Sequence, residues 1–234
     1  MIRSVVAIGV VLSLSGAAMT RASDEPPPVS LAVVYDLTMA PVSVDVGADP
    51  RLKLVLRVVS DSLTNRDTVR VGFLTGNMSW SRTFGVEQRS ILYSEAVSHF
   101  SVPVVSRWRW PALCDGLYDA VSALAHDDGR RAVVVITAGH SAGNIHSFDE
   151  LVAHARETHV SLSAVHEPWP GNGRGSNSPE QYIKYWSHFP VSPSVLLTKI
   201  TAATDGTYIA PQPHVSGDLK RRLNDVLAAI HQKE

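Results

Sequence analysis

The stretch GRRAVVVITAGHSAGN, residues 129–144, decides the fold. Its central part, residues 132–137, is a continuous apolar run, which is typical of a strand buried on both faces of a parallel sheet. A loop rich in glycine and small residues follows this run at once. In open α/β sheets, ligands bind beyond the carboxyl ends of the strands. The stretch therefore predicts a buried parallel strand followed by a loop at the ligand-binding edge.

The rest of the chain repeats this arrangement. We predict helices at residues 51–63, 116–124, 148–158, 194–204 and 217–231. The predicted strands are residues 31–36, 69–74, 80–84, 132–137, 160–165 and 207–209. Strands that alternate with helices of this length indicate βαβ units. The expected fold class is α/β, a Rossmann-like doubly wound architecture with a mostly parallel central sheet and helices on both faces.

The first 22 residues have the composition of a secretory signal peptide. Arg3 precedes the apolar residues 5–18, and small residues follow, so cleavage is expected after Ala18 or Ala22. The apolar run is shorter than the roughly 20 residues that span a bilayer, so no transmembrane anchor is expected after cleavage. Residues 23–30 are a predicted linker. We expect the mature protein to be secreted or periplasmic.

Size and charge narrow the classes of function. A chain of 234 residues with 44% hydrophobic residues can form one sizeable α/β core, and one domain is predicted at residues 31–231. Removal of Arg3 and Arg21 with the signal peptide changes the formal charge from −1 to −3, and no basic stripe indicates nucleic acid. Cys114 is the only cysteine, which excludes an intramolecular disulfide.

Residues 139–143, GHSAG, have the Gly-x-Ser-x-Gly pattern of serine esterases, which makes Ser141 a candidate nucleophile. In such enzymes the serine stands on a sharp strand-to-helix turn with a helix directly behind it. Here Ser147 and Glu150 form a Ser-x-x-Glu capping box, so the helix is predicted to start at Phe148, after an intervening loop. A secreted serine hydrolase that uses Ser141 is therefore the alternative function.

Residues 167–193 interrupt the alternation with a long insertion rich in Pro, Gly, Ser and Asn. It follows a predicted strand and so leaves from the carboxyl edge of the sheet. Loops of this length in a compact domain are usually functional or disordered. Its aromatic residues either cap the core or bind a partner, and they are Trp169, Tyr182, Tyr185, Trp186 and Phe189.

Taken in order, three segments resemble a von Willebrand factor A-type domain, in particular the secreted bacterial variety. Residues 33–40, VVYDLTMA, stand where that family has a strand followed by Asp-x-Ser-x-Ser. Residues 116–121, GLYDAV, are similar to its Thr-x-Leu-Tyr-Asp-Ala helix start, and residues 129–139 are similar to its Gly-Arg-Arg, apolar strand and Thr-Asp-Gly ending. The resemblance covers residues 31–231. It implies a protein-interaction module, for adhesion or binding, without enzymatic activity.

The resemblance also implies a metal-ion-dependent adhesion site, in which a divalent cation such as Mg²⁺ is held by oxygen ligands from three loops. Asp36 and Thr38 match the first loop. Ala40 stands in place of the second hydroxyl, Asp115 in place of a threonine, and Ala138 in place of the last aspartate. Alanine has no oxygen in its side chain, so two ligands are lost.

Two interpretations of the remaining residues follow. Asp36, Thr38 and Asp115 could hold Mg²⁺ in a rearranged site, because two carboxylates and waters suffice for this ion. Alternatively, Asp36 caps a strand end, Asp115 caps a helix that begins at Gly116, and the site is degraded. In the second case no cofactor is expected. Contact with a protein partner of unknown identity would then depend mainly on the aromatic residues of the insertion.

Overall fold

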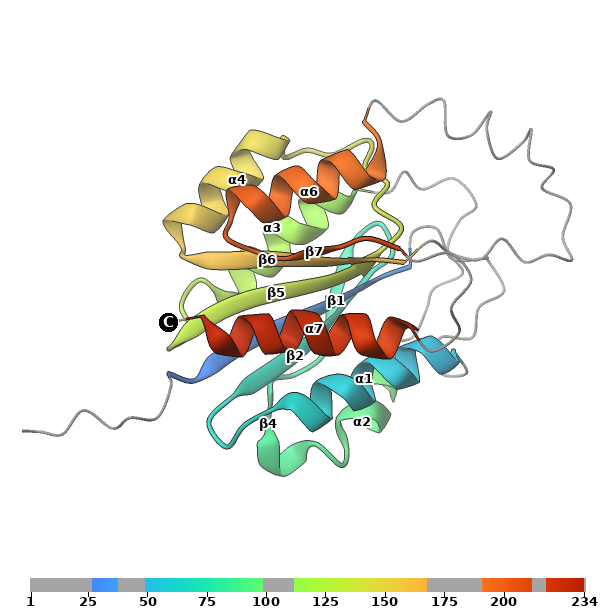
Figure 1. The fold of residues 1–234 in the computed structure, drawn as a ribbon, viewed down its shortest axis with the longest axis vertical. Helices are drawn as coiled ribbons and strands as arrows, with labels where there is room; N and C mark the ends of the chain where they lie inside the picture. The colour runs from blue at the N-terminus through green and yellow to red at the C-terminus, as the bar shows by residue number, and fades with distance from the viewer. Residues whose placement is uncertain (1–26, 38–48, 99–111, 168–190, 212–217, 234) are drawn as a thin grey trace, which may run out of the picture.

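The computed structural model describes residues 27–37, 49–98, 112–167, 191–211 and 218–233 (Figure 1). The predicted signal peptide at residues 1–22 lies outside them. No helix within the described ranges is long and apolar enough to cross a membrane.

One sheet forms the centre of the described structure. It consists of β1 (Val29–Asp36), β2 (Thr68–Leu74), β3 (Met78–Trp80), β4 (Phe84–Gly85), β5 (Arg130–Thr137), β6 (Val160–His166) and β7 (Tyr208–Ile209). The order is β3-β2-β1-β5-β6-β7, and β4 also pairs with β2. Strands β2, β1, β5, β6 and β7 are parallel, whereas β3 and β4 run antiparallel to β2. The predicted mostly parallel sheet is confirmed.

The predicted strand at residues 80–84 is wrong in its extent, because residues 81–83 separate β3 from β4. At this point the backbone N–H of Val71 donates to the side-chain hydroxyl of Ser81 at 2.9 Å. A side-chain oxygen thus takes the place of a backbone carbonyl as the hydrogen-bond acceptor. The hydrogen-bond ladder between β2 and its antiparallel neighbours is interrupted at this point.

Helices cover both faces of the sheet, as expected (Figure 1). Their bounds are α1 (Pro50–Ser62), α2 (Leu92–Ser98), α3 (Leu113–Leu124), α4 (Phe148–Glu157), α6 (Pro193–Ala203) and α7 (Asp218–Gln232), with a short 3-10 turn η2 (Val86–Gln88). Helices α1, α2 and α7 pack on one face, and α3, α4 and α6 pack on the other. The short helix α2 was not predicted. The capping box of Ser147 and Glu150 begins α4 at Phe148, as predicted.

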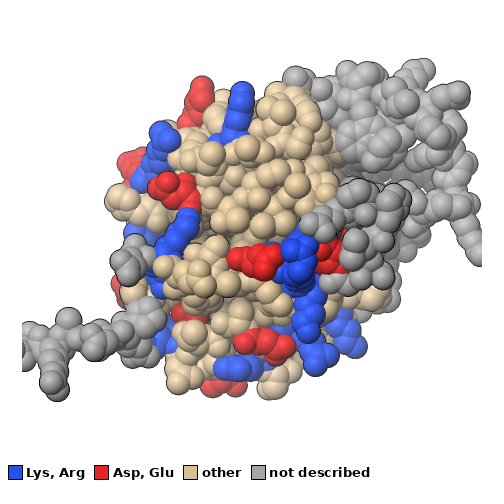
Figure 2. Space-filling model, in the orientation of Figure 1, with Lys and Arg blue, Asp and Glu red and all other residues tan. Residues whose placement is uncertain are grey.

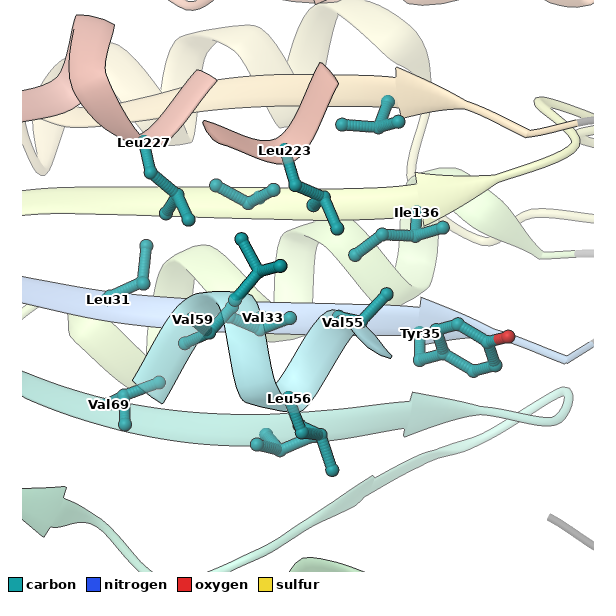
Figure 3. Packing of buried hydrophobic residues seen from close by; sticks show 14 of the residues in the cluster. Leu31, Val33, Tyr35, Val55, Leu56, Val59, Val69, Ile136, Leu223 and Leu227 are labelled. Carbon is teal, nitrogen blue, oxygen red and sulfur yellow. The ribbon is translucent and has the colours of Figure 1, made fainter. Parts of the chain in front are cut away.

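The alternation of side chains along β1 divides the core between the two faces. Every residue of β1 is buried. Leu31, Val33 and Tyr35 point toward α1 and α7 (Figure 3), whereas Ala32 and Val34 belong to the cluster on the α3 face. A strand buried on both faces has no polar side, which is why its sequence is a continuous apolar run.

The order of the strands identifies the ligand edge. From β1 the chain passes through α1 to β2 on one side, and it later returns through α3 to β5 on the other side of β1. The carboxyl ends of β1 and β5 are therefore the topological switch point, where open α/β sheets bind ligands. These two strands end at Asp36 and Thr137.

The face that carries α7 and α1 shows Lys and Arg side chains interspersed with Asp and Glu side chains (Figure 2).

The carboxyl end of α7 is fixed to the amino edge of the sheet. Arg130 donates from its guanidinium to the backbone carbonyls of Ile230, at 3.1 Å, and His231, at 3.2 Å. The Nε2 atom of His231 lies 3.0 Å from Oδ2 of Asp67, whose other oxygen accepts from the backbone N–H of Val29 at 2.8 Å.

The hydrogen bond to Asp67 raises the pKa of His231. Burial alone would raise the pKa of Asp67, but hydrogen bonds from His231, Thr64 and Val29 outweigh it and lower the pKa to about 2.

These pKa shifts predict a pH-dependent contribution to stability. The raised pKa of His231 stabilises the fold fully below the unfolded-state pKa of about 6.5, and this contribution is lost as the pH rises through the folded-state pKa. The lowered pKa of Asp67 stabilises the fold above about pH 4, and this contribution is lost as the pH falls toward 2. We expect His231→Gln to lower the free energy of unfolding by up to about 1 kcal/mol at pH 5 and by less at pH 9. Urea unfolding at the two pH values measures this difference.

His126→Gln is the matched control, because the exposed His126 makes no ion pair with another described residue. An equal loss of stability for His231→Gln at both pH values would show that the His231–Asp67 pair does not act through charge.

Candidate functional site at the carboxyl edge of the sheet

At the switch point, β1 and β5 are joined by a buried hydrogen bond between side chains. The hydroxyl of Thr137 donates to Oδ2 of Asp36, and neither residue is exposed by more than 1%. The same hydroxyl accepts from the backbone N–H of Gly139 at 2.8 Å. Gly139 has a φ of +77°, which favours glycine, and this conformation turns the chain away from β5. Asp36 is thus linked through Thr137 to the start of the β5–α4 loop.

The β5–α4 loop caps helix α3. The N-cap residue of α3, Ala112, has no side chain that could satisfy the first amides of the helix. Instead, the backbone N–H of Cys114 donates to Oδ1 of Asn144 at 3.0 Å and lies 3.3 Å from the Ser141 hydroxyl. Asn144 and Ser141 also bond to each other, at 2.9 Å. Side chains about 30 residues away in the sequence therefore provide the cap.

In return, helix α3 holds the loop through Asp115. The Asp115 carboxylate accepts from the backbone N–H of Ile145 at 2.9 Å and from that of His146 at 2.7 Å. We call these reciprocal bonds the loop clamp: Cys114 and Asp115 of α3 with Ser141, Asn144, Ile145 and His146 of the loop. The interpretation that Asp115 caps a helix beginning at Gly116 is wrong, because α3 begins at Leu113 and the carboxylate bonds to another loop.

Aromatic stacking extends the contact between α3 and the segment that follows β5. The Tyr118 ring lies between two histidine rings, with its centroid 3.8 Å from that of His146 and 4.3 Å from that of His154. His154 also bonds to the Ser122 hydroxyl at 2.9 Å. The sequence analysis missed this stack, because its members come from a loop and two separate helices.

The surroundings of Ser141 give no support to the hydrolase alternative. Its hydroxyl contacts Cys114 and Asn144, and among the described residues it bonds to no histidine or carboxylate that could activate it. The neighbouring His140 is 1% exposed, and burial together with His166 lowers its pKa to about 3. The sharp turn is also absent, because residues 142–147 separate Ser141 from α4.

The described part of the edge brings together few of the side chains that could hold a divalent cation. Within the described ranges, no three His, Cys, Asp or Glu residues gather closely enough to hold a metal ion. Ala138 provides no side-chain oxygen, and the carboxylate of Asp115 is turned onto two loop amides. The structure brings Asp36 and the segment that holds Asp115 to the same edge, whereas Thr38 lies outside the described residues.

Both ends of the predicted insertion lie at this edge. The backbone N–H of Glu167 donates to the carbonyl of Thr137 at 2.8 Å, and Pro193 lies directly against Gly139. The predicted binding residues themselves lie outside the described ranges: Trp169, Tyr182, Tyr185, Trp186 and Phe189.

The sequence matches no protein-family model, and a search of curated proteins finds no match. Solved structures do resemble the fold. A von Willebrand factor type A protein from Catenulispora acidiphila matches with a TM-score of 0.56 and 15% identity, over 89% of this chain and 44% of that one. An aerotolerance-related membrane protein from Bacteroides fragilis matches with a TM-score of 0.54 and 16% identity, over 86% of this chain and 98% of that one.

A third similar structure is proximal thread matrix protein 1 from the mussel byssus, in a form whose metal-ion-dependent adhesion site holds zinc. Its TM-score is 0.54 at 13% identity, over 88% of this chain and 46% of that one. This chain thus spans less than half of the Catenulispora and mussel proteins. Together with the strand order and the two helical layers, these matches show that the protein has the von Willebrand factor A-type fold.

The loop clamp predicts that Asp115 stabilises the protein without a metal ion. Asp115→Ala leaves two backbone N–H groups without their acceptor, and we expect a loss of about 1–3 kcal/mol in the free energy of unfolding in buffer containing EDTA. Urea unfolding measures this loss. Asp119→Ala, one turn further along α3, is the control, because Asp119 accepts no hydrogen bond from another described residue. Its expected change is within about 0.5 kcal/mol. Equal effects of the two substitutions would contradict the assigned role of Asp115.

Proposed function

We propose that this protein is an exported interaction module of the von Willebrand factor A type, which binds a protein partner through its carboxyl-edge loops, with a degraded metal site and without turnover. The observation that supports this most is the loop clamp. It fixes the start of α3 against the β5–α4 loop by hydrogen bonds between described residues. A partner would therefore meet loops that are already ordered, which lowers the entropic cost of association.

The clamp also presents an apolar side chain to solvent. Asp115 holds the backbone of Ile145, and the Ile145 side chain is 88% exposed. Val191, just before α6, is 43% exposed, and Val195, in the first turn of α6, is 45% exposed. Exposed apolar side chains at a ligand edge are typical of a protein-binding surface. We include the aromatic residues of the insertion in this surface, because the insertion starts and ends at the same edge.

Two further parts of the proposal rest on the sequence and on local chemistry. Export rests on the signal-peptide composition of residues 1–22. The absence of turnover rests on the surroundings of Ser141, whose hydroxyl has no base among its described partners.

Site-specific photocrosslinking tests the proposed surface. A benzophenone amino acid replaces Ile145 in one variant and Glu157 in a matched control, and the native extract supplies the partner. Glu157 is also exposed, but it ends α4 at the amino edge of the sheet. We expect one defined adduct from position 145 and none from position 157. Adducts from position 157 alone, or the same adducts from both positions, would contradict binding at the carboxyl edge.

A further inference from the structure

The carboxyl end of β6, where the insertion begins, is joined to the segments on both sides through His166. The Nδ1 atom of this ring lies 3.0 Å from the hydroxyl of Tyr208 on β7, and the ring also hydrogen-bonds to the backbone of Ala138, directly after β5. The next backbone N–H, that of Glu167, donates to the carbonyl of Thr137 at 2.8 Å. His166 therefore connects β6 with β7 and with the start of the β5–α4 loop.

Helix α7 adds a buried arginine to these contacts. Arg222 is 4% exposed, and its guanidinium donates to the carbonyl of His166 at 2.9 Å and to the carboxylate of Glu167. Its Nε atom lies 2.5 Å from Oδ2 of Asp218, whose other oxygen accepts from Arg221 at 2.6 Å. Two carboxylates thus balance two guanidinium groups. The network has no net charge as long as His166 is neutral.

The surroundings of His166 favour its neutral form. Burial lowers the pKa of His166, the bond to Ala138 opposes this in part, and the positive charge of Arg222 adds to the lowering. The buried His140 of the β5–α4 loop lies close enough to His166 for charge on one ring to disfavour charge on the other. Helix α6, which also packs on β6, carries one charged residue, the exposed Lys199. The described groups around the two rings thus supply no carboxylate that is free to pair with a second positive charge. Those carboxylates are Glu167 and Asp218, bonded to arginines, and Asp36 of β1, bonded to Thr137.

We propose that His140 and His166 make the carboxyl edge sensitive to acid: the neutral rings hold β6, β7 and the β5–α4 loop together, and protonation in a mildly acidic medium loosens these contacts. We call His140, His166, Tyr208 and Arg222 the histidine latch. A protonated imidazole donates from both nitrogens, so Nδ1 of His166 could no longer accept from the Tyr208 hydroxyl. Its charge would also be added beside Arg222. The proposal rests on the proposed function in one respect, because a loosened edge would release the partner.

The direction of the effect follows from the lowered pKa values. A histidine with a lowered folded-state pKa contributes stability above its unfolded-state pKa of about 6.5, and this contribution is lost as the pH falls toward the folded-state value. For His140 that value is about 3. Each histidine that gains a proton only when the latch opens makes opening up to about tenfold easier for each pH unit below about 6.5. The pKa of His231 is raised and acts in the opposite direction, so a local measurement is needed.

Amide hydrogen exchange measured by NMR at about pH 7.5 and about pH 5.0, corrected for the intrinsic exchange rate, tests the latch. The reporter is the N–H of Glu167, which bonds across to Thr137. We expect its opening constant to be about tenfold higher, or more, at the lower pH. The N–H of Ser81, which donates to the carbonyl of Val71 beside β2, is the reference, and its opening constant should change by less than about threefold.

His166→Gln removes the titrating group and keeps the hydrogen bonds, because the glutamine amide can accept from Tyr208 and donate to a backbone carbonyl. We expect this variant to reduce the acid-induced rise in opening at Glu167 by at least about threefold. His126→Gln, at an exposed histidine outside the latch, should leave the rise unchanged. An absent rise in the unmodified protein, or an equal rise in His166→Gln, would overturn the proposal.

The ring nitrogen signals of His166 in the unmodified protein provide a test that needs no variant. The latch requires that the ring gain its proton over the same pH range in which the Glu167 amide becomes exposed. Protonation of the ring without faster exchange at Glu167 would also overturn the proposal.

Photocrosslinking from position 145, repeated at the two pH values, separates this proposal from the proposed function. We expect a defined adduct at the higher pH and a loss of that adduct at the lower pH. An undiminished adduct while the Glu167 amide opens would contradict release by acid. The absence of any adduct at the higher pH would instead contradict the binding surface itself, whereas the exchange of the Glu167 amide does not depend on a partner.

Discussion

The hydrogen bonds that run both ways between α3 and the β5–α4 loop determine the geometry of the carboxyl edge. Asn144 and Ser141 satisfy an amide at the start of α3, and Asp115 in that same turn satisfies two amides of the loop. Each of the two segments thus supplies side-chain acceptors for backbone N–H groups of the other. A carboxylate in the first turn is also favoured by the helix dipole. Because the loop is further joined to β1 through Thr137, the clamp couples α3 to the centre of the sheet.

The fold could be predicted from the sequence because burial of a parallel strand on both faces demands a continuous apolar run. Residues 31–36 and 132–137 have this pattern, and both lie in strands at the centre of the sheet. The start of α4 could be predicted for a different reason, since its capping box is local, with Ser147 and Glu150 three residues apart. Features that depend only on residues close together in the chain, such as a buried strand or a capping box, can therefore be predicted from the sequence.

The start of α3 could not be predicted from the local sequence. Its N-cap is Ala112, and the groups that satisfy its amides come from a loop about 30 residues further on. The prediction therefore placed the helix start three residues late, at Gly116, and assigned the wrong bonds to Asp115. The stacking of Tyr118 between two histidine rings escaped prediction in the same way, because it exists only once α3 and α4 pack.

The central claim is that hydrogen bonds, without a metal ion, hold the carboxyl-edge loops together. Amide hydrogen exchange of Cys114, Ile145 and His146, measured by NMR in EDTA and again with millimolar Mg²⁺, tests it most directly. These three N–H groups are the donors of the loop clamp. The account predicts that all three are protected in EDTA and that Mg²⁺ changes their exchange rates by less than about twofold. Rapid exchange in EDTA that becomes slow only when Mg²⁺ is added would contradict it.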